Sequence, residues 1–397
     1  MEPSLWPAVS ERPDGSLELE AREGVTEAVI RTLAQGASAV EAHDGRGVPP
    51  PFSVRALAPL PAVPPGERAI AVDQTNHSVI AGETVVVKWF PRPSRAPHPA
   101  PGLLAHLAGF HRTATPYAAI FWEEALVALV TAYLPGAQDG WEWCVDEAVA
   151  GRTAFAAEIG RLAAELHVAM ATPSEIFPDP VRLPPRPGSA ARPGFAARAE
   201  EALREALTLH DPDRLNDQDR LHDPDLPSGK EWLNDAEWLR LHADHLRREL
   251  APLASAGRSP LIRIHGDLHV GQILRWREGY AVVDFDGNPT VTDAEAFQPA
   301  ARDLAQLTTS VEHVGQVAIK RRSMDPAAMV AWVAAARAGV ESAYADALAE
   351  AGREELLDRS LLRPFEVEQE CRELIYAARH LPRWRYAPMG VLRSWFA

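Results

Sequence analysis

The sequence predicts an α+β fold in which a strand-rich N-terminal part is followed by a mainly helical C-terminal part. Between residues 72 and 134 the apolar residues form short β-branched runs separated by tight turns. After residue 153 they recur at helical spacing over long stretches. Near residues 263–289, two short apolar runs alternate with acidic loops. Together, these three observations predict a small two-stranded hairpin near residues 263–289, within the helical part, with polar loops at its ends.

The composition excludes several classes of protein. The chain has 397 residues and a formal net charge of −15, from 40 Lys and Arg against 55 Asp and Glu. This balance argues against binding to nucleic acid or to an anionic membrane surface. Only two cysteines occur, so we expect no disulfide framework. No apolar run reaches the roughly 20 residues of a membrane span, and no signal sequence is visible, so we expect a cytoplasmic protein.

Residues 1–71 are expected to form an N-terminal cap subdomain, because a strand-like alternation and a short helical pattern precede Pro-rich connectors. Residues 72–134 are expected to form a β-rich lobe. Within this lobe, Ser78–Phe90 has the pattern of a strand, a tight turn at Gly82-Glu83 and a second strand. A second hairpin is predicted to turn at Glu123-Glu124.

Lys88 ends the second strand of the first hairpin, directly after three valines. An ammonium group in this place can contact the phosphates of a nucleotide. The alternative is a lysine that protects the end of an edge strand, and without further evidence this alternative is the better one.

Residues 135–397 are expected to form the helical lobe. It begins after a long apolar strand that runs into Ala132, Tyr133, Leu134 and a Pro-Gly connector. Amphipathic helices are predicted at Thr153–Met170, Ala301–Val317 and Phe365–His380. An acidic, low-complexity insertion at about 208–229 repeats the sequence Leu-His-Asp-Pro-Asp, and we expect it to be exposed to solvent.

The central motif joins two acidic loops to one predicted hairpin. Asp267 lies just before the first strand, Gln272–Leu274, and Asp284 lies just after the second, Ala281–Val283. In an antiparallel hairpin these two positions lie side by side. One carboxylate can take the proton of an attacking hydroxyl while the other, with the Gln272 amide, holds Mg²⁺ against phosphates. The pattern therefore indicates phosphoryl transfer.

Two other interpretations of this motif remain open. The loops could simply cap the hairpin, with His265 and His269 as buried structural histidines. Alternatively, those two histidines could bind a metal ion. Neither interpretation explains the second acidic loop, so we prefer phosphoryl transfer.

The motif resembles that of protein kinases, in which an Asn follows the catalytic Asp by five positions and a metal-binding Asp follows the next strand. The segments His265–Gln272 and Asp284–Gly287 look like those of the aminoglycoside phosphotransferase-like kinases. The longer segment from His265 to Pro289 resembles the corresponding segment of maltokinases and related glucosamine kinases. The stretch Glu368–Trp384 resembles the C-terminal stretch of the glucosamine kinases. The resemblance covers the chain from about Ser78 onward and implies a bilobal protein-kinase-like fold.

The resemblance also implies roles for individual residues. Asp267 would be the base, and Gln272 and Asp284 would hold Mg²⁺. Lys88 would contact the phosphates of ATP, whose adenine would meet the backbone of Ala132, Tyr133 and Leu134. One departure from the kinase pattern is that the next predicted helix, Pro101–Phe110, contains no carboxylate to pair with Lys88.

The last predicted helix carries Glu366, Glu370 and Glu373 on one face. Periodicity alone indicates a solvated helix face. The resemblance instead implies an acidic wall that, with Asp267 and His269, binds an amino sugar. Among the three glutamates, Glu370 is the first choice to pair with the ammonium group of the sugar. We expect a kinase that converts glucosamine to glucosamine 6-phosphate. The alternatives are a maltokinase forming maltose 1-phosphate, an aminoglycoside phosphotransferase, and a pseudokinase that only binds ligands. We expect a monomer or weak homodimer.

Overall fold

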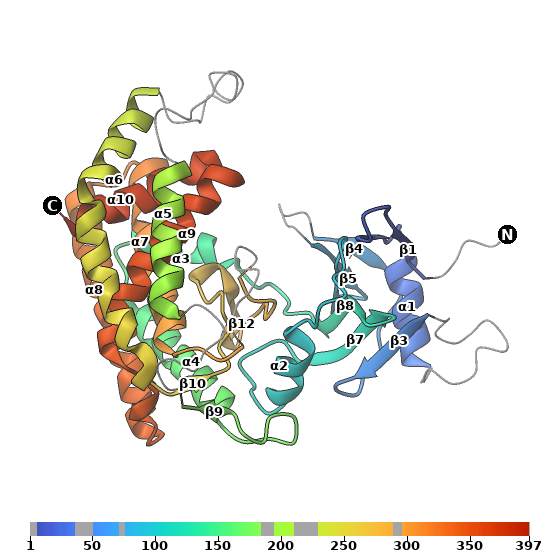
Figure 1. The fold of residues 1–397 in the computed structure, drawn as a ribbon. Helices are drawn as coiled ribbons and strands as arrows, with labels where there is room; N and C mark the ends of the chain where they lie inside the picture. The colour runs from blue at the N-terminus through green and yellow to red at the C-terminus, as the bar shows by residue number, and fades with distance from the viewer. Residues whose placement is uncertain are drawn as a thin grey trace. The chain divides into compact units, whose positions relative to one another are not determined.

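A computed structural model describes residues 6–35, 51–70, 76–183, 194–209, 229–288 and 296–396. The chain divides into two compact units. The first, here called the sheet unit, comprises Met1–Ala137, Ser174–Phe177 and Trp276–Asp286. The second, here called the helical unit, comprises Gln138–Pro173, Pro178–Arg275 and Gly287–Ala397. Figure 1 shows the strands gathered in the first and the long helices in the second. The predicted α+β class is therefore confirmed.

A six-stranded antiparallel sheet forms the centre of the sheet unit, with strand order β3-β7-β8-β6-β5-β4. Its strands are β3 (Phe52–Ala56), β4 (Glu67–Ala69), β5 (His77–Ala81), β6 (Val85–Trp89), β7 (Pro116–Trp122) and β8 (Ala125–Ala132). Gly82 and Glu83 both have left-handed backbones, with φ of 56° and 49°, as a two-residue hairpin turn requires. Both predicted hairpins of the N-terminal lobe are confirmed. Because β6 lies between β8 and β5, the edge-strand interpretation of Lys88 is wrong.

The N-terminal elements pack on this sheet. The hairpin β1 (Ala8–Glu11) and β2 (Leu17–Glu20) precedes α1 (Val25–Ala34), and α2 (Ala100–His106) follows β6. Apolar residues of α1 share one hydrophobic core with β5, β6, β7 and β8. Strands β3 and β4 precede residue 71 and yet belong to the same sheet as the strands after it. The predicted division into three domains stays a prediction.

Helices build the helical unit around α7, which is buried along most of its length. The helices are α3 (Gly140–Val149), α4 (Ala154–Met170), α5 (Phe195–Leu209), α6 (Gly229–Leu250), α7 (Ala301–Arg322), α8 (Pro326–Glu350), α9 (Leu362–Arg379) and α10 (Tyr386–Trp395). Short 3₁₀ turns are η3 (Ala251–Arg258), η4 (Val270–Gln272), η5 (Glu354–Leu356), η6 (Arg359–Leu361) and η7 (Pro382–Trp384), and strands β9 (Val181–Arg182) and β10 (Leu261–Ile262) pair.

The three helices predicted from periodicity are confirmed by α4, α7 and α9, although α7 continues to Arg322. The predicted acidic insertion lies, at residues 210–228, outside the described residues. None of the described helices is both long enough and apolar enough to cross a membrane.

The predicted central hairpin consists of β11 (Ile273–Trp276) and β12 (Gly279–Val282). Gln272 lies in the turn η4 and not in the first strand as expected. The division between the units falls within β11, so Asp267 belongs to the helical unit and Asp284 to the sheet unit. Their expected adjacency stays a prediction.

Candidate functional site

Helix α7 holds the loop that carries Asp267. The two carboxylate oxygens of Asp303 accept the backbone N–H groups of His265 and Gly266, at 2.8 and 2.9 Å. Gly266 has a left-handed φ of 82°, which glycine adopts without strain. Further along α7, Ser310 Oγ accepts the N–H of Val270 at 3.0 Å. The loop backbone is thus anchored at three points on a single helix.

Two amide side chains occupy one oxygen of Asp267. Oδ1 accepts the amide of Gln306 at 2.6 Å and that of Asn288 at 3.1 Å. The other oxygen, Oδ2, lies 3.7 Å from Nε2 of His269. Because Oδ1 already accepts two hydrogen bonds, Oδ2 is the better placed oxygen to receive a proton from a bound hydroxyl.

His269 faces this carboxylate with its protonated nitrogen. Its Nδ1 accepts the N–H of Gly271 at 3.0 Å, so the ring proton lies on Nε2. Burial alone would raise the pKa of Asp267, but its contact with His269 and its hydrogen bond from Gln306 outweigh burial and hold that pKa below its ordinary value. Asp267 is therefore ionised at neutral pH, as a general base must be.

Trp141, Trp384 and Glu373 follow His269 in a series of side-chain contacts. The Trp141 ring lies 5.7 Å from the His269 ring and 5.6 Å from that of Trp384. Trp384 Nε1 donates to Oε2 of Glu373 at 2.8 Å, and Gln369 donates to the other oxygen at 3.0 Å. The half-buried carboxylate of Glu373 is therefore connected to Asp267 by a row of successive contacts through Trp384, Trp141 and His269.

The two tryptophans of α3, Trp141 and Trp143, differ in their burial. Trp143 is fully buried and donates to the carbonyl of Ile273 at 2.8 Å. Trp141 is only half buried and takes part in the row just described.

The expectation that Glu366 and Glu370 lie on a solvated face is wrong, because they are 3% and 0% exposed. Glu366 pairs with Arg337 and accepts the Thr308 hydroxyl at 3.1 Å, which relieves the repulsion expected between glutamates one turn apart. These contacts favour a structural role for Glu366.

Glu370 lies against His313, whose Nε2 is 3.1 Å from Oε2. Burial, with the nearby charges of Glu373 and Glu366, raises the pKa of Glu370 well above its ordinary value. Burial likewise lowers the pKa of His313 to about 4. Burial thus disfavours the charged form of both side chains, which makes Glu370 a poor partner for a cationic group.

In the sheet unit, Lys88 joins the second acidic loop. Its Nζ lies 2.7 Å from Asp284 Oδ1 and 2.5 Å from Asp286 Oδ2. Asp284 has a left-handed φ of 67°, a conformation that Asp adopts more readily than most residues. Burial lowers the pKa of Lys88, but the two carboxylates outweigh it and leave that pKa raised. Asp284 and Asp286 thus take the place of the carboxylate that α2 lacks.

Asp286 was not among the predicted site residues. Its Oδ1 is buried without a hydrogen-bond partner among the described residues, and His98 Nε2 lies 3.9 Å away. Burial and the neighbouring Asp284 raise its pKa to about 6. The sequence did offer a signal for Asp286, because it is a second carboxylate only two positions after Asp284.

In the predicted adenine-binding segment Ala132–Leu134, two backbone N–H groups already donate hydrogen bonds within the protein. The N–H of Ala132 donates to Thr115 O at 2.8 Å, and that of Tyr133 donates to Thr84 O at 2.9 Å. Leu134, the third predicted residue, is buried. Gln272, predicted to bind metal, lies half buried in the helical unit, and its N–H donates to His269 O at 2.9 Å.

Sequence reasoning also missed the residues of α7 that support the site. Asp303, Gln306, Ser310 and His313 recur at a spacing of three or four, which places them on one face of the helix. All four are buried. The regular spacing of these four polar residues was the available signal.

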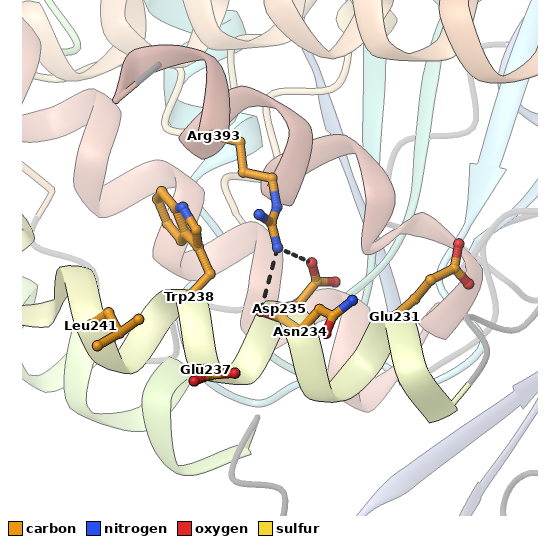
Figure 2. Close-up of a pocket in the computed structure, with 7 residues that line it drawn as sticks. All are labelled: Glu231, Asn234, Asp235, Glu237, Trp238, Leu241 and Arg393. Carbon is orange, nitrogen blue, oxygen red and sulfur yellow. Dashed lines mark hydrogen bonds and ion pairs between the residues drawn. The ribbon is translucent and has the colours of Figure 1, made fainter.

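A pocket of about 430 Å³ lies between α6 and α10. Figure 2 shows Arg393 reaching from α10 to Asp235 on α6, with Nη2 2.9 Å from Oδ1. None of the predicted site residues is among the residues that line it, so we assign it no part in the chemistry. The lining residues are Glu231, Asn234, Asp235, Glu237, Trp238, Leu241 and Arg393.

The chain is similar to proteins of known activity over nearly its whole length. The glucosamine kinase of Streptacidiphilus jiangxiensis is 36% identical over 404 residues, which cover 96% of this chain and 83% of that protein. The glucosamine kinase of Mycolicibacterium smegmatis (strain ATCC 700084 / mc(2)155) is 36% identical over 346 residues, covering 82% and 79%. No protein-family model matches.

A solved structure supports the same likeness. A glucosamine kinase in complex with glucosamine, ADP and inorganic phosphate superposes with a TM-score of 0.74 at 33% identity. The superposition covers 98% of this chain and 91% of that one.

Proposed function

The chain belongs to the glucosamine kinase family, and from this membership we propose that it transfers the γ-phosphate of ATP to the 6-hydroxyl of glucosamine. The observation that carries the proposal is the row of contacts from Asp267 to Glu373 in the helical unit. It places an ionised base at one end and a carboxylate at the other. A sugar with both a reactive hydroxyl and an ammonium group suits such a row.

Asp267 is the proposed general base. Its Oδ2 takes the proton of the 6-hydroxyl while the hydroxyl oxygen bonds to the γ-phosphorus and the bridging oxygen leaves with ADP. The amides of Gln306 and Asn288 hold Oδ1, so the carboxylate keeps one orientation during the transfer. Positioning of this kind supplies most of the rate gain in phosphoryl transfer.

The residues of the second acidic loop fit Mg²⁺, which prefers oxygen ligands. Asp284 supplies a carboxylate, and the buried Oδ1 of Asp286 has no hydrogen-bond partner among the described residues. Among the described residues, no group of three or more His, Cys, Asp or Glu side chains is arranged to hold a metal ion. We propose Asp284 and Asp286 as the protein ligands in the sheet unit, and the metal-binding role expected for Gln272 stays a prediction. When bound, Mg²⁺ would neutralise charge on the phosphates.

Lys88 and the segment after β8 are the proposed nucleotide contacts. Lys88 is held by Asp284 and Asp286, so its ammonium group is already oriented where phosphates would bind. Because Ala132 and Tyr133 use their N–H groups within the sheet unit, we propose that adenine meets the backbone N–H of Leu134 and the carbonyl of Tyr133.

Glu373 is the proposed partner of the glucosamine ammonium. It is half buried and reaches Trp384, whereas Glu370 is fully buried and its pKa is raised by that burial. Glu366 is already neutralised by Arg337. This assignment revises the first expectation, which favoured Glu370. The expectations of a cytoplasmic location and of a monomer or weak homodimer stay predictions.

The position of the phosphate on the product tests the proposal. We expect ³¹P and ¹H NMR of a reaction with MgATP and glucosamine to show a phosphate coupled to the protons of carbon 6. A product phosphorylated at carbon 1, or no product at all, would contradict the proposed reaction.

A further inference from the structure

His98 lies beside the second acidic loop, within the sheet unit. It belongs to the segment between β6 and α2, and Lys88 and Asp286 are part of the same unit. The His98 ring packs against Phe90, with the two ring centroids 5.1 Å apart. The Nζ atom of Lys88 lies 5.6 Å from the centroid of the same Phe90 ring. His98 and Lys88 therefore share one aromatic neighbour.

The contact of one ring nitrogen fixes the tautomer of His98. Nδ1 accepts the backbone N–H of Ala100, the first residue of α2, at 3.3 Å. A ring nitrogen that accepts a hydrogen bond has no proton of its own, so the proton of His98 lies on Nε2. Nε2 is therefore a donor. Among the residues that the structure describes, it has no acceptor within hydrogen-bonding distance.

Nε2 lies near a carboxylate oxygen that also lacks a hydrogen-bond partner. Its distance to Oδ1 of Asp286 is 3.9 Å, which is too long for a hydrogen bond. That oxygen accepts no hydrogen bond from the described part of the chain. The side chains of His98, Lys88 and Asp286 are 22%, 18% and 17% exposed. A ligand can therefore contact a donor and an acceptor that do not bond to each other.

Two donors flank the carboxylate of Asp286. The Nζ atom of Lys88 contacts Oδ2, and Nε2 of His98 lies near Oδ1. Phosphate oxygens are strong acceptors, and a hydrogen bond to an ionised group is about twice as strong as one between neutral groups. A phosphate that binds beside Lys88 therefore suits the N–H group of His98 as well.

We propose that His98 binds the phosphates of the nucleotide, through a hydrogen bond from Nε2 to a phosphate oxygen. The proposal rests on the proposed function, since it takes Lys88 and Asp286 as groups that surround those phosphates. It goes beyond that function because it adds a neutral donor to the phosphate site.

Replacement of His98 by the two amides separates the roles of its two ring nitrogens. Asn places its side-chain oxygen near the position of Nδ1, so His98→Asn keeps an acceptor for Ala100 but has no donor at the position of Nε2. Gln is longer, so His98→Gln keeps a donor near Nε2. We expect the Kd of MgADP, measured by calorimetry, to rise about ten- to a hundredfold in His98→Asn, because a hydrogen bond to a charged group is lost. His98→Gln should keep most of the affinity.

Adenosine, which has no phosphates, is the control ligand, and its Kd should stay within about twofold of the wild-type value in both variants. His106→Asn is the control variant. His106 lies on α2 in the same unit, its Nδ1 is 2.6 Å from Oγ of Ser174, and its ring packs on Phe177 at 5.0 Å. This variant should bind MgADP as the wild type does.

The opposite order of the two amides would overturn the proposal. If MgADP affinity is unchanged in His98→Asn, or falls only in His98→Gln, His98 serves only to hold the start of α2 through Ala100. An equal loss of adenosine and MgADP affinity would also exclude a phosphate contact. Should His98→Asn fail to fold, His98→Phe decides the question, because it keeps an aromatic ring against Phe90 but offers no donor.

Binding of MgADP alone separates this proposal from the proposed function, because it needs neither glucosamine nor turnover. If the wild-type protein phosphorylates no glucosamine, the proposed function fails, whereas weaker MgADP binding in His98→Asn would still support the phosphate contact. If the wild-type protein phosphorylates glucosamine and His98→Asn binds MgADP with wild-type affinity, the phosphate contact alone is wrong.

Discussion

Asp267 combines two properties that a general base needs in phosphoryl transfer. It is ionised, because its contacts with His269 and Gln306 outweigh the effect of burial on its pKa. It is also oriented, because two amides hold one of its oxygens. The opposite case is Glu370, whose pKa is raised by burial. At the scale of single residues, environment separates carboxylates of similar chemistry into different roles.

Replacement of the base is the first test at this scale. Asp267→Asn keeps the side-chain shape, so the fold and MgATP binding should be preserved. We expect kcat to fall by roughly 10²–10⁴-fold, the usual contribution of general acid–base catalysis, because the hydroxyl loses its proton acceptor. Steady-state kinetics with a nucleotide-binding measurement checks both parts. Near-normal turnover would remove Asp267 from the mechanism.

The carboxylate that binds the ammonium group is the second test. Glu373→Gln should reduce the preference for glucosamine over glucose by about ten- to a hundredfold in kcat/KM, since a charged hydrogen bond contributes about 1.5–3 kcal/mol. Glu370→Gln is the matched control on the same helix and should leave the preference unchanged. A loss of preference in Glu370→Gln alone would restore the original expectation for that residue.

At the scale of secondary structure, α7 organises the helical unit. One of its faces supplies Asp303, Gln306 and Ser310 to the active-site loop, while α9 packs on the same helix. A buried ion pair joins the two helices, because Glu368 of α9 accepts Arg302 of α7 at 2.7 Å. The catalytic loop therefore depends on the packing of α9 as well as on its own sequence.

The pH dependence of stability tests this packing. Burial raises the pKa of Glu368, but Arg302 and Arg372 outweigh it and leave that pKa below its ordinary value of 4.5. A carboxylate whose folded pKa is depressed stabilises the fold above its unfolded pKa, and this contribution is lost as pH falls through the folded pKa. The free energy of unfolding in urea should therefore fall as the pH drops below about 4.5.

Glu368→Gln should lower the free energy of unfolding at pH 7 by about 3–5 kcal/mol, because it leaves buried guanidinium groups without their carboxylate. It should also weaken the loss of stability in acid. Glu350→Gln breaks an exposed pair with Arg161 and should change neither quantity measurably. An acid-sensitive stability identical in Glu368→Gln and wild type would exclude this residue as a source of it.

The sequence predicted those features of the site that depend on residues close together in the chain, and it did not predict those that depend on contacts between distant segments. Asp267, Asp284 and Lys88 stood in short motifs in which residue type and spacing carry the chemistry. The burial of Glu366 and Glu370 could not be predicted, because periodicity reports which residues share a face but not what covers it. Their partners Arg337 and His313 come from other helices. The support of Asp267 by Gln306 is equally long-range.

At the scale of the whole molecule, the proposed site residues belong to two units of the chain. Asp267, the proposed base, and Glu373, the proposed partner of the ammonium group, belong to the helical unit. Lys88, Asp284 and Asp286, the proposed nucleotide and metal contacts, belong to the sheet unit. Phosphoryl transfer from ATP requires groups of both kinds.

Removal of a metal ligand tests the contribution of the sheet unit. In the wild-type protein, Mg²⁺ should tighten ATP binding measured by calorimetry, because the cation links carboxylates to phosphates. Asp284→Ala should lose most of this Mg²⁺-dependent gain. Binding of ATP without Mg²⁺ is the control. Asp284→Ala also removes an ion-pair partner of Lys88, and binding without Mg²⁺ measures the effect of that loss alone. An unchanged response to Mg²⁺ would show that Asp284 is not a ligand.

The most direct measurement for the proposed activity is ADP production by the wild-type protein with MgATP and a panel of acceptors. The panel consists of glucosamine, N-acetylglucosamine, glucose, maltose and kanamycin. We expect glucosamine to have the highest kcat/KM, about ten- to a hundredfold above N-acetylglucosamine and glucose, because only its ammonium group satisfies Glu373. Equal use of glucosamine and N-acetylglucosamine, or a preference for maltose or kanamycin, would contradict the account.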